Sequence, residues 1–225
     1  NRWIAHKLSS EQPNPNYTEP QSTPQQIIRL FEVLTHNTIQ DFKEPIDSAL
    51  NKVSIRINGY KTGSKVNCTV KDLHDTTSDA FPHILQKLIL KFDIFPATQN
   101  AHTQQQALAE LLQWTNQTFY ANSSSTPQRN DLHTDYEALL NTIAAQLYPN
   151  YFTTHTTKTT IYNTLIVLES ELHLPRLFDV DTIIAAKSFD PFTALLFIAL
   201  IKNKLRKREI RGIIFDLDGV ITDTA

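Results

Sequence analysis

The sequence has no methionine, one cysteine and only four glycines among its 225 residues. The lone Cys68 excludes an internal disulfide framework and suits a reducing compartment, so we expect a cytoplasmic protein. A backbone that closely approaches phosphate needs glycines, and two of the four, Gly212 and Gly219, lie near the carboxyl terminus. A glycine-rich phosphate loop is therefore excluded from most of the chain. Because the first residue is not methionine, we expect the printed sequence to be a piece of a longer protein.

A strong charge of one sign is also missing. The formal net charge is −2 and the sequence pI is about 6.5, so no overall basic field attracts nucleic acid or an anionic membrane. The most apolar run, within residues 191–205, is closed by Lys202 and Lys204 and is too short to span a bilayer. A composition of 40% hydrophobic and 20% charged residues is typical of a globular protein. We therefore expect a folded protein with no membrane span and no nucleic-acid partner.

What the sequence does contain is helical periodicity. Apolar residues recur at helical spacing within residues 2–8, 23–34, 78–95, 103–120, 135–147, 160–172 and 192–207. Residues 42–58 stay open between helix and strand, because Val53, Ile55 and Ile57 alternate as in a strand. The pattern predicts a mainly α fold, with a first helical domain at residues 1–96 and a second at 103–207. Each domain opens with a helix that carries a tryptophan.

The end of the chain differs from the rest. Gly212 to Asp216 is a run rich in β-branched residues, and Leu217, Asp218 and Gly219 follow it directly. This pattern predicts a single β-strand and turn within residues 208–225. A lone strand has unpaired edges, so we expect the segment to be incomplete by itself.

Several stretches resemble the calponin-homology family. Residues 111–116, Leu-Leu-Gln-Trp-Thr-Asn, are similar to the first helix of that family, which reads Leu-Leu-x-Trp-x-Asn. Residues 169–181 are similar to the segment before the family's last helix, and residues 187–198 to that helix. In the first half, residues 2–8, 30–34 and 85–94 resemble helices of the tandem actin-binding region of α-actinin, spectrin, filamin and fimbrin relatives.

This resemblance implies two calponin-homology-like domains that bind F-actin or another cytoskeletal protein without a cofactor. The family's actin contacts are attributed to three helices, which correspond here to residues 2–8, 83–92 and 104–117. The partner-binding candidates carried over are Arg2, Lys7, His83, Lys87, Lys91, Gln105, Gln113 and Gln117. We expect four of these side chains to be exposed: Lys7, Lys87, Lys91 and Gln113. We expect the apolar side chains of the same helices to lie in the core: Trp3, Ile4, Ile84, Leu88, Leu108 and Leu112.

The carboxyl-terminal segment resembles a different family. Residues 215–225, which include Asp216, Asp218 and Gly219, are similar to motif one of haloacid-dehalogenase phosphotransferases, and especially of β-phosphoglucomutase. The resemblance implies that Asp216 is the nucleophile and Asp218 the general acid and base. It also implies that Asp216 and the backbone carbonyl of Asp218 hold Mg²⁺. The family's other catalytic groups follow motif one in the chain, and no residues before 207 replace them.

Three interpretations stay open. The first is a non-catalytic cytoskeletal binding module, and the second is the amino-terminal piece of a Mg²⁺-dependent phosphatase or phosphomutase. The third is a helical scaffold that binds some other protein. Eight histidines are scattered without the spacing of metal ligands, so we expect no metal site among them.

Overall fold

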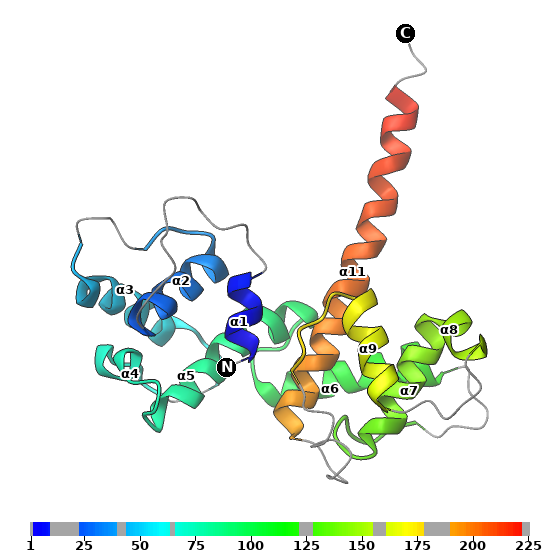
Figure 1. Cartoon of the computed structure of the whole chain (residues 1–225), viewed down its shortest axis with the longest axis horizontal. Helices are drawn as coiled ribbons and strands as arrows, with labels where there is room; N and C mark the ends of the chain where they lie inside the picture. The colour runs from blue at the N-terminus through cyan, green and yellow to red at the C-terminus, as the bar shows by residue number, and fades with distance from the viewer. Residues whose placement is uncertain are drawn as a thin grey trace. The chain divides into compact units, whose positions relative to one another are not determined.

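The computed structural model is mainly helical, which confirms the predicted fold class (Figure 1). It describes residues 2–9, 23–39, 44–63, 66–121, 128–154, 161–177 and 190–221. For residues 152–154 and 207–221 it describes the backbone alone. In this part of the chain, no helix has both the length and the apolar character required to cross a bilayer.

The chain forms two compact units. Unit 1 comprises residues 1–92 and 102–104, and unit 2 comprises residues 93–101 and 105–225. The segment at 96–102, which the sequence marks as a domain boundary, thus lies mostly within unit 2.

The described residues of unit 1 form five α-helices. They are α1 (Arg2–Ser9), α2 (Thr23–Thr35), α3 (Ile46–Gly59), α4 (Val70–His74) and α5 (Ala80–Ile89). Helix α2 packs on α1, α3 and α4, so it is the centre of the unit. Its Ile28, Leu30 and Phe31 are each 1% exposed. The helix begins where the sequence predicts, with Pro24 in its first turn, a position that needs no backbone N–H donor.

The last helix of unit 1 changes its winding. Helix α5 continues as the π-helical turn η1 (Leu90–Ile94) and then as the 3₁₀ turn η2 (Phe95–Ala97). The boundary between the two units falls within η1, after Phe92. Asp79 precedes α5 as its N-cap without a side-chain capping bond, although Ser78 accepts the backbone N–H of Phe81 with its carbonyl oxygen at 3.1 Å.

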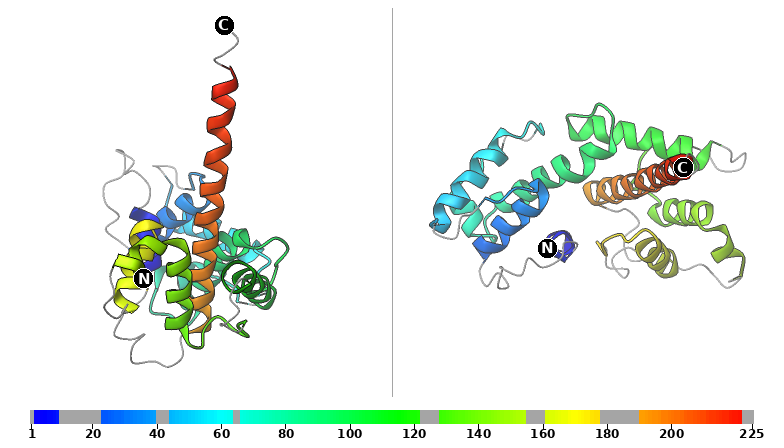
Figure 2. Two further views of the ribbon diagram at one scale, coloured as in Figure 1. Left: turned by 90° about the vertical axis from the view of Figure 1, so that its right-hand side faces the viewer. Right: turned by 90° about the horizontal axis from the view of Figure 1, so that it is seen from above.

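Unit 2 is built around its last helix. Its helices are α6 (Gln104–Thr115), which continues as the π turn η3 (Asn116–Tyr120), α7 (Tyr136–Leu147), α8 (Pro149–Thr154), α9 (Ile161–Glu171) and α11 (Pro191–Ile221). Figure 2 shows α11 running between α6 on one side and α7 and α9 on the other. Every residue from Ala194 to Ile201 is buried, as expected for a helix surrounded by others.

The predicted strand at the end of the chain is wrong. Residues 208–221 are the continuation of α11, so the backbone from Gly212 to Asp216 is helical. The physical reason is that a strand needs neighbours to satisfy its backbone groups, whereas an existing helix adds one internal hydrogen bond with each residue. The apolar residues 191–201 start α11, and the Lys- and Arg-rich residues that follow are good helix formers.

The ambiguous segment in unit 1 is helical from Ile46 onward, where α3 begins. Val53 and Ile57 are fully buried in α3, but Ile55 between them is 62% exposed, so the alternating pattern does not reflect a two-sided sheet. The short helices α4 and α8 are not apparent from periodicity, because each is too short to repeat an apolar face. The start of α4 is set locally, because Thr69 and Asp72 form a capping box there.

Candidate binding surfaces

Helix α1 presents the first candidate residues. Arg2 is exposed, while Trp3 and Ile4 are 4% and 8% exposed, which confirms that these two side chains lie in the core. Lys7 is half-buried, one helical turn after Trp3, and its Nζ atom lies 5.7 Å from the centroid of the Trp3 ring. Lys7 is therefore held against the indole face by a cation–π contact and is less free than expected.

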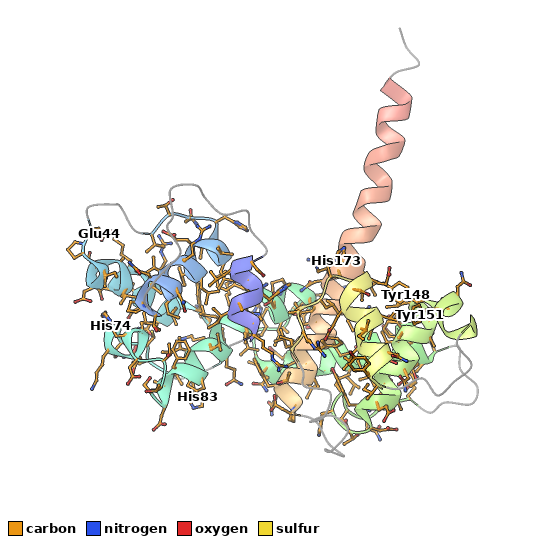
Figure 3. All side chains as sticks on the ribbon, viewed as in Figure 1. Glu44, His74, His83, Tyr148, Tyr151 and His173 are labelled. Carbon is orange, nitrogen blue, oxygen red and sulfur yellow. The ribbon has the colours of Figure 1, made fainter. Side chains whose placement is uncertain are left out.

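The three candidate residues on helix α5 and its extension differ in their exposure to solvent. His83, labelled in Figure 3, and Lys91 are exposed. Lys87 is only 3% exposed, so the expectation that it lies on the surface is wrong. Ile84 and Leu88 flank Lys87 on the buried side of the helix, and a lysine stem can pack there along apolar neighbours.

The charge of Lys87 acts on Cys68, the only cysteine in the sequence. Cys68 is buried, and burial together with nearby Asp72 raises the pKa of its thiol to about 11, although Lys87 and Ser54 oppose the shift. The thiol is therefore protonated at neutral pH and is a poor nucleophile. Lys87 and Cys68 belong to the packing of unit 1 and not to its binding surface.

Helix α6 and its extension η3 carry a row of exposed glutamine side chains, the glutamine stripe. Gln105, Gln113 and Gln117 are all exposed, and Gln105 and Gln113 lie two turns apart on one face. The opposite face is buried through Ala107, Leu111 and Thr115. Leu108 and Leu112 are only half-buried, because they lie about 100° around the helix from that buried line. The expectation that these two leucines are core residues is therefore only partly met.

The flanks of α6 are tied to the rest of unit 2. Glu110 accepts the backbone N–H of Gln99 at 2.8 Å and that of Asn100 at 3.3 Å. The Nζ atom of Lys202 on α11 lies 5.3 Å from the centroid of the Trp114 ring. Burial lowers the pKa of Lys202, and Glu110 partly opposes this change. These contacts fix the direction in which the glutamine stripe faces.

In each unit, one asparagine side chain makes two hydrogen bonds to the backbone of a single loop residue, an arrangement called the asparagine clasp here. In unit 2, the side chain of Asn116 donates to the carbonyl of Arg129 and accepts its backbone N–H, both at 2.9 Å. In unit 1, Asn58 makes the same pair of bonds to Cys68, at 2.9 and 2.7 Å. Asn116 is the last residue of the stretch that resembles the calponin-homology signature, so the structure gives that asparagine a physical role.

Replacing Asn116 with alanine is expected to lower the free energy of unfolding of unit 2 by about 1–3 kcal/mol, because both backbone groups of Arg129 lose their partner. Urea unfolding followed by tryptophan fluorescence measures the change. Gln113→Ala on the exposed face is the control and is expected to stay within about 0.5 kcal/mol. Equal stability of Asn116→Ala and the unmodified chain would contradict the clasp.

The candidates for phosphotransfer lie on α11. The backbone at Asp216 and Asp218 is helical, which differs from the strand and turn that the motif requires. Their side chains lie outside the described residues. Among the side chains that the structure does describe, no group of three or more His, Cys, Asp or Glu residues is placed to hold a metal ion. His74 pairs instead with Asp47 at 2.7 Å, and His133 lies 3.5 Å from Asp131.

No protein-family model matches the chain, and no curated protein matches it. The structure by itself defines a mainly helical protein made of two compact units.

Proposed function

We propose that this chain is a non-catalytic, cytoplasmic binding module that attaches to actin filaments through two calponin-homology-like helical units. The observation that carries the proposal is the placement of the candidate residues. Of the eight side chains transferred from the family resemblance, six are exposed: Arg2, His83, Lys91, Gln105, Gln113 and Gln117. They come from α1, from α5 with its extension, and from α6 with its extension η3, the three segments to which the family's actin contacts correspond.

The chemistry of these surfaces favours binding over catalysis. The exposed groups are cations, an imidazole and amides, which recognise a partner through hydrogen bonds and charge. They lie on helix faces whose opposite sides are buried, so the units hold them in fixed positions. The single thiol is buried and protonated, as described above.

The phosphotransferase alternative has less support from the backbone. It depends on a strand that delivers Asp216 at its carboxyl end, and the backbone there is helical. A helical scaffold for some other protein remains the competing function, and filament binding distinguishes the two.

We expect charge changes on the exposed faces to weaken attachment to filaments. Lys91→Glu and the pair Gln113→Glu and Gln117→Glu each introduce negative charge on a candidate face, and we expect about tenfold weaker binding from each. Co-sedimentation with a series of filament concentrations measures the affinity. All three positions are exposed, so folding is expected to be unchanged.

The matched control is Lys71→Glu. Lys71 is an exposed lysine on α4, away from the three candidate helices in the sequence. We expect it to pellet with filaments like the unmodified chain. If the control loses as much affinity as Lys91→Glu, the effect reports net charge and the proposed faces are wrong.

A further inference from the structure

A rigid aromatic group lies at the carboxyl end of α3. Tyr60 follows the helix directly, and its ring stacks on Phe31 of α2 with centroids 6.3 Å apart and an interplanar angle of 15°. Phe92 approaches the same ring edge-on, with centroids 5.6 Å apart and an angle of 86°. Tyr60 itself is half-buried, so this firmly held residue remains partly accessible to solvent.

Two exposed cations flank this ring. The Nζ atom of Lys91 lies 5.7 Å from the Tyr60 centroid. Arg56 precedes Tyr60 by one helical turn, and its charge lowers the pKa of the Tyr60 phenol against the larger effect of burial, which raises it. Within the described part of the chain, no carboxylate forms an ion pair with Arg56 or Lys91.

The neighbouring cation on α3 is different. Lys52 lies one turn before Arg56, and its Nζ atom is 2.7 Å from a carboxylate oxygen of Glu44, which Figure 3 labels beside α3. Glu44 therefore neutralises Lys52, whereas among the described residues Arg56 and Lys91 have no carboxylate partner and Lys91 contacts only the Tyr60 ring.

An apolar side chain completes the surface. Ile55, next to Arg56 on α3, is 62% exposed, more than any other large hydrophobic side chain that the structure describes. An exposed isoleucine on the same helix as Arg56, near a fixed tyrosine that carries two cations, has the composition of a protein-binding hot spot, where tyrosine and arginine are enriched.

We propose that this basic–aromatic patch, formed by Ile55, Arg56, Tyr60 and Lys91, binds an acidic polypeptide segment that carries an apolar side chain. Carboxylates of the segment pair with Arg56 and Lys91, and its apolar side chain covers Ile55. Stable attachment to anionic lipid takes clusters of about four to eight cations, so two cations fit a peptide better than a membrane. The patch shares only Lys91 with the proposed filament-binding residues, and it does not depend on filament binding.

The test uses the full chain and a fluorescein-labelled peptide of glutamates around a central leucine. Fluorescence anisotropy measures its affinity, and a peptide with glutamine in place of each glutamate is the control. We expect the acidic peptide to bind and the glutamine peptide not to bind. We expect Arg56→Gln with Lys91→Gln to weaken binding about tenfold or more, with a difference that shrinks as salt is added.

Two further variants make the result specific. Ile55→Ser is expected to weaken binding about fivefold through lost apolar contact. Lys71→Gln with Arg176→Gln removes one exposed lysine and one exposed arginine elsewhere and is expected to leave the affinity unchanged. Circular dichroism and the melting temperature show that each variant is folded.

Three results would overturn the proposal. The first is an acidic peptide that does not bind the unmodified chain. The second is an equal loss of affinity in the Lys71 and Arg176 control, and the third is an unchanged affinity in Ile55→Ser. Binding to vesicles of anionic lipid with the same dependence on Arg56 and Lys91, in the absence of peptide binding, would also overturn it. Because filaments are not used, failure of actin binding leaves this test intact.

Discussion

Replacing Phe197 with alanine is expected to lower the free energy of unfolding of unit 2 by about 3–5 kcal/mol. Phe197 is fully buried in the part of α11 where every residue from Ala194 to Ile201 is buried. Removing its ring leaves a cavity between α11 and the helices that surround it. A loss of this size is a large fraction of the stability of an ordinary domain.

The measurement can be confined to unit 2, because each unit has one tryptophan. In a Trp3→Phe background, the emission of Trp114 reports unit 2 alone during urea unfolding. Ile166→Ala on α9 is the control, since Ile166 is 39% exposed, and a change within about 0.5 kcal/mol is expected. A loss below about 1 kcal/mol in Phe197→Ala would contradict the central position of α11.

Replacing Phe31 with alanine is expected to destabilise unit 1 by a similar amount, about 3–5 kcal/mol. Phe31 is 1% exposed on α2, which packs on three other helices of the unit. The change also removes the ring on which Tyr60 stacks. An aromatic pair of this kind contributes about 0.5–1.5 kcal/mol beyond the area that it buries.

Phe31→Leu separates packing from stacking. Leucine keeps much of the buried volume, so we expect a smaller loss of stability, about 1.5 kcal/mol or less from packing. It still removes the stacking partner of Tyr60, so we expect weaker binding of the acidic peptide in a folded protein. Trp3 emission in a Trp114→Phe background measures stability. Equal stability of Phe31→Ala and the unmodified chain would show that α2 is not the centre of unit 1.

Much of the fold follows from spacing in the sequence. Phe81, Ile84 and Leu88 recur at helical intervals, and all three are buried in α5. The buried line of α6 and the start of α2 at Thr23 are equally local, since side-chain periodicity and proline geometry decide them. The mainly helical class could therefore be predicted without the structure.

The wrong predictions concern residues whose structure depends on contacts with residues far away in the sequence. Nothing near Lys87 in the sequence indicates that it lies beside buried Cys68, because the two residues belong to different helices and loops. Ile55 completes an alternating pattern that is typical of strands, yet α3 leaves it exposed. The run from Gly212 to Asp216 has strand propensity, but propensity is overridden when no neighbouring strand exists and a helix leads into it.

The candidate surfaces were only partly predictable. Gln113 and Lys91 were expected to be exposed, and both are. The basic–aromatic patch could not be predicted, because its Tyr60 is held by Phe31 and Phe92 from two other segments of the chain. The π-helical turns η1 and η3, at the ends of α5 and α6, also carry no pattern that periodicity detects.

The central claim is most directly tested by co-sedimentation of the unmodified chain with actin filaments at near-physiological salt. We expect the protein to pellet with filaments in a saturable manner and to stay in the supernatant without them. A chain that remains in the supernatant at filament concentrations of tens of micromolar would contradict the account and leave the helical scaffold as the better description.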